Sequence, residues 1–407
     1  MTLIAVEEAQ ALALAHAEPC LAQEVGLREA AGRILAQPAV ARFALPGVDV
    51  SVMDGYACTL ATLRAGGARV VGESAAGHPW PATIEGGAAV RISTGAVVPP
   101  GADLVVAQED VTRDGDELRF DPGIIATAVG GKHIRRAGSD VRTGEVLVVP
   151  GQTLGPAELA LLGGAGVSRV QVSRRPRVAI LSTGDELLSI GDTPEPGGVI
   201  STNGLMLATL CAQAGASVIV ERTIGDEPRA LAAALDEALA TADVVLTSGG
   251  ASVGDHDHLH AAARRVGFEI LAWGIALRPG KPTGIVRTTG GLWFALPGNP
   301  ASTFVAFELF VRPTLRRMLG VRSDARRALR RMTAGGEFLG ERTREHWVRA
   351  WTTDDIVAPL PDQLSGNLRS LATADALVRV PAGCSRIAPG TPCDVLVFDS
   401  NGHERPS

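Results

Sequence analysis

The stretch DVVLTSGGASVGDHD (residues 243–257) decides the fold, because an apolar run leads directly into a loop of glycines and hydroxyl side chains. Such a run predicts a buried strand, and the neighbouring sequence repeats it as RVAILS, SVIVERT, FEILAWGIAL and LWFALP. Helix-like segments separate these runs, at residues 203–214, 227–241, 257–266 and 301–319. Strands and helices that alternate at this spacing predict an α/β fold with a mostly parallel sheet covered on both faces. Ligands of such folds bind beyond the carboxyl ends of the strands.

The loop at residues 247–257 has the composition of an anion-binding loop. Its glycines allow positive φ and close approach of the backbone to a ligand, and its Thr and Ser side chains add hydroxyl donors. The N–H groups and the dipole at the start of the following helix attract an anion. We therefore expect a phosphate-bearing ligand here; a strand-to-helix connection without a ligand is the alternative. The residues concerned are Thr247, Ser248, Gly249, Gly250, Ser252 and Gly254.

Two carboxylates close this loop, at Asp255 and Asp257. Beside phosphates, carboxylates commonly hold Mg²⁺, which needs only one or two of them. Capping of the next helix is the competing interpretation, because aspartate is a preferred N-cap residue. His256 and His260 have the i, i+4 spacing of a helical metal site, but no third soft ligand accompanies them. A solvated helix start explains these two residues, and His258 between them, more simply.

Two further polar turns follow predicted strands. In STGDEL (182–187), Asp185 and Glu186 could orient a substrate or hold a metal, and capping is the alternative. In PGNPAS (297–302), Ser302 stands at a helix start, so N-capping competes with ligand binding.

The segment RPGKP (278–282) places two cations on a rigid turn. Its prolines and glycine fix the backbone, while Arg278 and Lys281 project three positions apart. This is a compact way to bind an oxyanion or a phosphate, and a proline-rich surface turn is the alternative. Near the N-terminus, SVMDGYA, RISTGA and AGSD each place a carboxylate or hydroxyl beside a glycine, which turn chemistry explains equally well.

The length of 407 residues exceeds what one hydrophobic core supports, so at least two domains are expected. Short β-like runs between 60 and 130 predict a β-rich domain, and a second β-rich segment follows to about 398. Residues 5–18, 28–36 and 156–163 look helical.

The composition excludes several classes of protein. A net charge of −6 leaves no basic field for nonspecific nucleic-acid binding. The five cysteines form no C-x-x-C pair, and their odd number fits a reduced cytosol better than a disulfide framework. The N-terminus has adjacent glutamates and no basic region, so it does not read as a signal peptide. Without an apolar run of about 18 residues no membrane span is expected, and we predict a cytoplasmic protein.

Together these motifs resemble the molybdopterin molybdenumtransferase family, whose module also forms the C-terminal domain of gephyrin. The resemblance runs from about residue 5 to 398. It rests on the joint order of SVMDGYA, RISTGAVVPPGADLVVAQED, IRRAGSD, STGDEL, TSGGASVGDHD, RPGKP and PGNPAST. The reaction that it implies takes adenylylated molybdopterin and molybdate, inserts molybdenum into the dithiolene, and releases AMP with the help of Mg²⁺.

The resemblance also implies a domain organisation. A central α/β domain of the molybdopterin-binding type (176–322) is joined to a discontinuous first domain (1–53 plus 135–175). A β-rich domain (54–134) is inserted in the first, and a β-barrel-like domain (323–407) ends the chain. The family works as a homodimer, with each active site between the α/β domain of one subunit and parts of its partner. Further implied partners are a molybdopterin adenylyltransferase and molybdoenzymes, and neither nucleic acid nor membrane is implied.

Site residues are carried over from the same resemblance. The implied catalytic residues are Asp257, Glu186, Asp226, Asp54, Thr94 and Asp140, of which the last three would face the partner's cleft. Asp257 and Glu186 are the implied Mg²⁺ ligands. The pterin and phosphate would be held by Thr183, Ser248, Gly249, Gly250, Ser252, Gly254 and Asp255. The oxyanion would be held by Arg278, Lys281, Pro282, Ser302, Arg344 and Ser365.

Two positions depart from the family pattern. The family often has Lys where this chain has Arg278, and the planar, bidentate guanidinium changes the oxyanion geometry. Residues 48–52 read VDVSV where the family usually reads FDNSA. A tungsten-preferring paralogue and a non-catalytic scaffold of the gephyrin type are the alternative functions.

Overall fold

The structure is a computed structural model that describes residues 3–250, 258–264 and 267–398. The chain forms two compact units. The larger unit comprises residues 1–23, 150–153 and 172–407, and the smaller comprises residues 24–149 and 154–171. No helix within the described ranges is long and apolar enough to cross a membrane. All five cysteines are free thiols.

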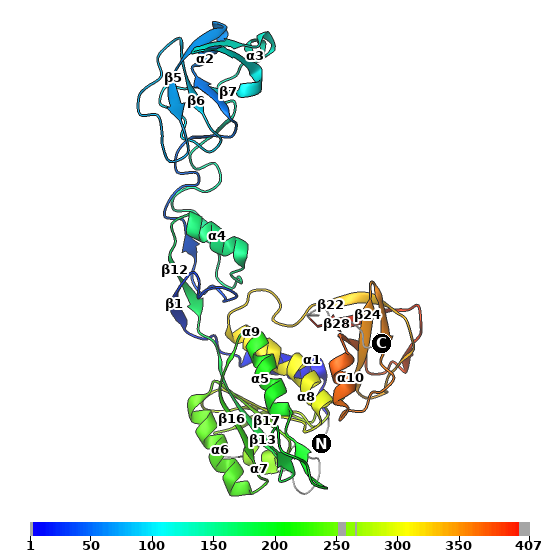
Figure 1. Cartoon of the computed structure of the whole chain (residues 1–407). Coiled ribbons are helices and arrows are strands. Elements are labelled where there is room, and N and C mark those ends of the chain that lie inside the picture. Colours follow the sequence, from blue (N-terminus) through cyan, green and yellow to red (C-terminus); the bar gives the residue numbers. More distant parts are fainter. Residues whose placement is uncertain (1–2, 251–257, 265–266, 399–407) are drawn as a thin grey trace. The chain divides into compact units, whose positions relative to one another are not determined.

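The larger unit is built on a six-stranded sheet in the order β16–β13–β17–β21–β20–β18. Figure 1 labels β16, β13 and β17 of this sheet. The first four strands are parallel, and β20 and β18 add two antiparallel strands at one edge. The carboxyl ends of β13, β17 and β21 therefore meet at the same edge of the sheet. The strands are β13 (Arg177–Thr183), β16 (Ser217–Ile224), β17 (Val244–Ser248), β18 (Glu269–Trp273), β20 (Gly284–Arg287) and β21 (Leu292–Leu296).

Both faces of this sheet are buried. Successive residues of a strand point to opposite sides, so they pack into different apolar clusters. In β13, Val178 and Ile180 belong to one apolar cluster, and Ala179 and Leu181 belong to another. Helices α1, α5, α8 and α9 contribute to the first cluster, and α6 and α7 contribute to the second. The predicted parallel sheet with two covered faces is thereby confirmed. These helices are α1 (Val6–Ala15), α5 (Asn203–Gln213), α6 (Pro228–Thr241), α7 (His258–Ala263), α8 (Pro300–Ala306) and α9 (Arg312–Met318).

Asp243 precedes β17 and ties three segments together at the amino end of the sheet. Its carboxylate accepts hydrogen bonds from Arg174 Nη1 and from the backbone N–H of Arg177, both at 2.7 Å. The Asp243 side chain is only 14% exposed. Burial raises the pKa of Asp243, but the hydrogen bonds from Arg174 and Arg177 outweigh burial and lower the pKa to about 2.

Replacing Asp243 by asparagine is expected to lower the free energy of unfolding at pH 7 by about 2 kcal/mol. The folded pKa lies below the unfolded value of about 3.9, so the stabilisation is present above that value. It is lost as the pH falls toward the folded pKa. Urea unfolding at pH 7 and at pH 3 should therefore show a gap between the proteins that narrows with acid. A gap of constant size would contradict this account; Glu269→Gln, in an exposed ion pair with Arg287, is the control.

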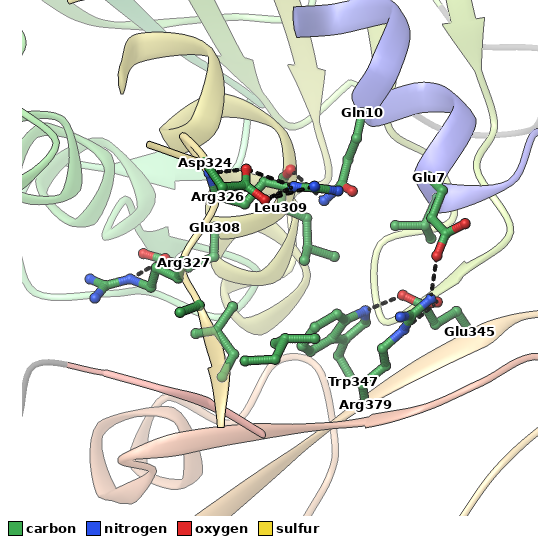
Figure 2. Close-up of a pocket in the computed structure, with 14 residues that line it drawn as sticks. Glu7, Gln10, Glu308, Leu309, Asp324, Arg326, Arg327, Glu345, Trp347 and Arg379 are labelled. Carbon is green, nitrogen blue, oxygen red and sulfur yellow. Dashed lines mark hydrogen bonds and ion pairs between the residues drawn. The ribbon is translucent and has the colours of Figure 1, made fainter. Parts of the chain in front are cut away.

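A π turn, η2 (Phe307–Val311), interrupts the helix that follows β21, between α8 and α9. Pro313 has no N–H to donate to the carbonyl of Leu309, four residues earlier. That carbonyl instead accepts a buried hydrogen bond of 2.9 Å from Gln10 Nε2 of α1 (Figure 2). A proline in α9 thus creates the acceptor that holds the N-terminal helix in place.

The same π turn buries a carboxylate. The Glu308 side chain is 1% exposed, and it accepts hydrogen bonds from Arg312 Nε at 2.8 and 2.9 Å and from Arg327 Nε at 2.9 Å. Arg327 lies in the segment that leads to the C-terminal domain, so this carboxylate joins that segment to the α/β domain.

The C-terminal part of the larger unit is a closed five-stranded barrel. Its strands follow the order β24–β25–β22–β28–β26, and β26 pairs back with β24. β19 (Leu277–Arg278), which comes from the α/β segment, extends this sheet by pairing with β24 in parallel. The barrel elements are β22 (Leu329–Ala334), β23 (Phe338–Leu339), β24 (Glu345–Thr353), β25 (Ile356–Pro359), α10 (Leu368–Thr373), β26 (Ala376–Val380), β27 (Arg386–Ile387) and β28 (Pro392–Val397).

Ion pairs connect α1 to this barrel beside a cavity of about 250 Å³ (Figure 2). Arg379 of β26 pairs with Glu7 of α1 at 2.9 Å and with the buried Glu345 at 2.7 Å. Glu345 also accepts a hydrogen bond of 2.7 Å from Trp347 Nε1. The charges that line this cavity therefore have partners within the fold.

The smaller unit contains a six-stranded sheet in the order β7–β4–β6–β5–β9–β8. Tyr56 and Cys58 pack on one side of it and Ala57 on the other, as alternation along a strand requires. Two short antiparallel pairs, β2 with β11 and β3 with β10, accompany it. Its elements are β2 (Ala39–Val40), β3 (Val50–Ser51), β4 (Gly55–Cys58), α2 (Leu60–Arg64), β5 (Gly67–Ser74), β6 (Ala88–Ile92), β7 (Leu104–Ala107), η1 (Gln108–Asp110), β8 (Val111–Asp114), β9 (Glu117–Phe120), α3 (Pro122–Ala126), β10 (Ile134–Arg135), β11 (Val146–Val148) and α4 (Pro156–Gly164).

The helix predicted at residues 28–36 is wrong. This segment forms turns up to Gly32, which has a φ of +69° and so stops helical propagation. The N–H of Gly32 donates to the carbonyl of Leu154 at 2.9 Å, and the N–H of Leu154 returns a bond to Arg33. The predicted fold class, an α/β protein with β-rich and barrel-like parts, is confirmed.

Candidate functional site

A cavity of about 590 Å³ lies at the carboxyl ends of β13, β17 and β21. This is the edge at which a parallel α/β sheet binds its ligands. The lining comes from the ends of the three strands and the turns after them, from residues 199–203, and from Asp226 and Pro282. The C-terminal domain adds two residues. The lining residues that matter for the argument are Thr183, Gly184, Glu186, Asn203, Asp226, Ser248, Gly249, Gly250, Pro282, Pro297, Asn299, Ser302, Gly366 and Leu368.

The turn after β17 packs tightly on the end of β13. Gly249 has a φ of +97°, and a Cβ added there would lie 2.2 Å from the carbonyl oxygen of Thr183. Gly250 has a φ of +63°, and its Cβ would lie 2.9 Å from Thr183 Oγ1. Only glycine allows the backbone to come this close to Thr183, so these two residues set the shape of the turn at the cavity.

Two buried oxygen atoms beside this turn have no hydrogen-bond partner among the described residues: Thr183 Oγ1 and Asn203 Oδ1. The Asn203 side chain is fixed, because its Nδ2 donates to Ser248 Oγ at 2.9 Å and to the carbonyl of Gly298 at 2.7 Å. Buried polar atoms are normally satisfied, so a polar ligand is a natural partner for both oxygens.

Replacing Gly249 by alanine is expected to cost about 3 kcal/mol of stability, since the new Cβ overlaps a backbone carbonyl at an unfavourable φ. Gly366→Ala, in the same cavity, is the matched control, because its nearest contact would be an ordinary 3.8 Å to Asn299. Thermal unfolding of the two variants measures the difference. Equal melting temperatures would show that the turn is not held against Thr183.

The acidic positions of the cavity are Glu186 and Asp226. Glu186 is exposed at the turn after β13, and Asp226 is half-buried after β16. Asp185, next to Glu186, accepts a hydrogen bond of 2.9 Å from the backbone N–H of Asp226. The two predicted carboxylates are thus brought to one cavity by a direct link between their turns.

Of the six residues predicted to hold the oxyanion, Pro282 and Ser302 line the cavity, and the other four are not among its lining residues. Ser302 is buried, and the half-buried Lys281 precedes Pro282. The carbonyl of Ser365 accepts a hydrogen bond of 3.0 Å from the N–H of Ala301. Because Ala301 directly precedes Ser302, this bond brings the backbone of Ser365 close to that of Ser302, although 63 positions separate them in the sequence.

Arg278 and Arg344 meet at a carboxylate that the sequence reasoning missed. Glu341 accepts a hydrogen bond of 2.5 Å from Arg278 Nη1, and bonds of 2.7 and 3.0 Å from Arg344 Nε and Nη2. Burial raises the pKa of Glu341, but the bonds from Arg344 and Arg278 outweigh burial and hold the pKa below its usual range. The Glu341 carboxylate is therefore ionised at neutral pH, and it is hydrogen-bonded to the guanidinium groups of both Arg278 and Arg344.

Three predicted residues lie in the smaller unit. Asp54 accepts hydrogen bonds from Thr94, at 2.6 Å from the backbone N–H and 2.9 Å from the hydroxyl. The backbone bond and then the hydroxyl bond lower the pKa of Asp54. Asp140 pairs with Arg135 and accepts a bond of 3.1 Å from Ser139 Oγ. Asp54 is thus hydrogen-bonded to Thr94, whereas Asp140 interacts with Arg135 and Ser139.

Part of the predicted loop lies outside the described residues: Ser252, Gly254, Asp255, His256 and Asp257. The ring of His260 in α7 lies beside that of Trp273, with centroids 4.9 Å apart and planes tilted by 47°. No group of three or more metal-ligating side chains occurs in the described part of the chain.

Asn203 and Glu341 were absent from the sequence prediction. Asn203 opens α5 at the carboxyl edge of the sheet, and that position is the signal that could have found it. Glu341 gave no such signal, because its partner Arg278 is brought to it by the pairing of β19 with β24.

Family models match three consecutive regions of the chain. Residues 4–166 match the "MoeA N-terminal region (domain I and II)" and residues 179–317 match the "Probable molybdopterin binding domain". Residues 331–398 match the "MoeA C-terminal region (domain IV)".

Full-length relatives decide the assignment. The molybdopterin molybdenumtransferase of Nostoc sp. is 34% identical over 390 residues, which cover 92% of this chain and 88% of that protein. The chain belongs to the molybdopterin molybdenumtransferase family. It is therefore a transferase of molybdenum-cofactor biosynthesis. Molybdopterin molybdenumtransferase 2 of Mycobacterium tuberculosis is 33% identical over 403 residues, 96% of this chain and 98% of that one.

A solved structure of this family has the same fold. The crystal structure of the molybdopterin biosynthesis MoeA protein from Pyrococcus horikosii superposes with a TM-score of 0.85 at 30% identity. The match covers 98% of this chain and 100% of that chain. The family resemblance drawn from the motifs is confirmed.

Proposed function

We propose that this transferase inserts molybdenum from molybdate into adenylylated molybdopterin and releases AMP. One observation carries the proposal: a single cavity joins the glycine-rich turns of the sheet to Pro282, Ser302 and the C-terminal domain. The turns suit a phosphate and a pterin, and the second group suits an oxyanion. An insertase needs both ligands beside each other, because correct placement replaces a chance encounter.

At the sheet side of the cavity, Gly249 and Gly250 allow a phosphate to approach the backbone. Thr183 Oγ1 and Asn203 Oδ1, which lack partners among the described residues, could accept from the N–H groups of a pterin. Ser248 Oγ accepts a hydrogen bond from Asn203 Nδ2 and so fixes the orientation of the Asn203 side chain. These groups would bind and orient the adenylylated substrate.

At the other side, Lys281 would supply a cation from the RPGKP turn, and Ser302 would supply a hydroxyl from the first turn of α8. Arg344 and Ser365 of the C-terminal domain, with Arg278, complete the proposed oxyanion set. A tetrahedral dianion is bound well by such fixed, charge-assisted donors. Stabilisation of the reaction would be mostly electrostatic, from groups already in place.

Magnesium fits the carboxylates of the cavity. Glu186 and Asp226 both line it, and Mg²⁺ needs only one or two carboxylates when phosphates supply other ligands. Glu186, together with Asp257 of the adjoining loop, would hold the ion, which would offset the charge of the phosphoanhydride. Asp226 would orient the substrate from the same side.

We further propose that the active unit is a homodimer in which Asp54, Thr94 and Asp140 act at the partner's cavity. The four-domain division at residues 53/54, 134/135, 175/176 and 322/323 belongs to the same proposal. The gaps between the matched family regions, at residues 167–178 and 318–330, support the last two boundaries. An adenylyltransferase and molybdoenzymes would be the neighbours in the reaction sequence.

The test is AMP release from purified protein mixed with adenylylated molybdopterin and Mg²⁺. We expect release that depends on molybdate, and tungstate in a parallel reaction measures metal preference. AMP that appears equally without any oxyanion would contradict the proposal, as would its complete absence. Faster release with tungstate would identify a tungsten-preferring paralogue, and binding without release would favour a scaffold.

A further inference from the structure

Glu341 occupies the two arginines assigned to the oxyanion. Arg344 donates to it through both Nε and Nη2, at 2.7 and 3.0 Å, so one edge of the guanidinium fork is used. Arg278 donates through Nη1 at 2.5 Å. The Glu341 side chain is 20% exposed and that of Arg344 30%, so the group is sheltered but reachable from solvent.

The fold holds these three side chains together from two parts of the chain. Arg278 is the last residue of β19 and lies opposite His346 of β24. Arg344 immediately precedes β24, and Glu341 lies three residues earlier in the same loop. The same turn carries a third cation, Lys281, three residues after Arg278.

We propose that Glu341 is an internal competitor that the oxyanion must displace from Arg344 and Arg278, and that this exchange selects doubly charged oxyanions. The inference rests on the proposed function, because it concerns the oxyanion end of that site. The Glu341 carboxylate accepts charge-assisted hydrogen bonds from Arg344 and Arg278. An oxyanion would accept hydrogen bonds of the same kind from the same two side chains.

The charge of the incoming anion decides the outcome of this exchange. A tetrahedral monoanion brings the same charge as the carboxylate that it replaces, and it also loses translational freedom that the tethered Glu341 has already lost. A dianion brings twice the charge to the same cations. Molybdate and tungstate should therefore displace Glu341, whereas perrhenate, a tetrahedral monoanion, should not.

The experiment is calorimetric titration of molybdate and of perrhenate into the wild-type protein and Glu341→Gln. The amide keeps the shape of the side chain and removes its charge. We expect molybdate to bind Glu341→Gln about tenfold more tightly than the wild type. In the variant, molybdate no longer has to displace a carboxylate from Arg344 and Arg278. We also expect perrhenate to bind the variant but not the wild type. Glu337→Gln is the matched control, because Glu337 is four positions away and pairs with Arg386 instead.

Two results would overturn the proposal. If wild-type protein binds molybdate and Glu341→Gln binds it equally or more weakly, Glu341 positions Arg344 rather than competing with the ligand, and the proposed function stands. If neither protein nor the control binds molybdate, the oxyanion site itself is wrong and both proposals fail together. Thermal unfolding of Glu341→Gln confirms that a changed affinity does not reflect a misfolded variant.

Discussion

Replacing Glu308 by alanine is expected to lower the free energy of unfolding by about 3–5 kcal/mol. The Glu308 side chain is 1% exposed and is the carboxylate shared by Arg312 and Arg327. Arg312 Nη2 already has no hydrogen-bond partner among the described residues. The substitution would leave two largely buried guanidinium groups without this counter-charge, which costs more than the lost bonds themselves. Urea unfolding, followed by tryptophan fluorescence, measures the effect.

An exposed pair in the same α/β domain provides the control. Glu237 accepts two hydrogen bonds from Arg222, at 2.7 and 3.0 Å, and thus has similar geometry, but its side chain is 60% exposed. Because water screens such a pair, Glu237→Ala should change stability far less than Glu308→Ala. Equal losses in the two variants would mean that burial of Glu308 is not what makes its pairing important.

Replacing Arg344 by alanine is expected to raise the molybdate concentration for half-maximal AMP release by about thirtyfold or more, equivalent to about 2 kcal/mol. The variant loses charge-assisted donors to the oxyanion, and it leaves Glu341 beside the site with Arg278 alone. Steady-state kinetics with varied molybdate and saturating adenylylated substrate measures the change.

The exposed Arg342, two positions earlier in the same loop, is the control for Arg344. Arg342→Ala removes the same net charge from the loop and should leave the molybdate dependence almost unchanged. A similar loss in both variants would show that long-range charge, rather than contact by Arg344, accounts for the effect. Arg344→Lys should restore only part of the affinity, since an ammonium cannot make the bidentate contact.

The sequence predicts the sheet and its binding edge because both follow from local patterns. Continuous apolar runs such as RVAILS and DVVL mark strands buried on both faces, and the turns after them must lie at one edge once the strands are parallel. Thr183, Ser248 and Gly249 are therefore predictable as cavity residues from the sequence alone.

Contacts between distant segments could not be predicted in this way. Gln10 donates a hydrogen bond to the carbonyl of Leu309, 299 residues away, which Pro313, having no N–H, cannot satisfy. Glu341 meets Arg278 because β19 leaves the α/β segment and pairs with β24 of the barrel. Residues 28–36 have helix-forming composition, but Gly32 and the pairing with Leu154 impose turns. In each case a long-range partner, which no local pattern encodes, determines the outcome.

The most direct test of insertion is the coordination of molybdenum after the reaction. Protein incubated with adenylylated molybdopterin, Mg²⁺ and molybdate would be freed of unbound metal and examined by X-ray absorption at the molybdenum edge. We predict sulfur ligands from the dithiolene in the first shell of the metal, with AMP released in equal amount. Release of AMP while molybdenum keeps only oxygen ligands would contradict the account, because the protein would then be hydrolysing its substrate without inserting the metal.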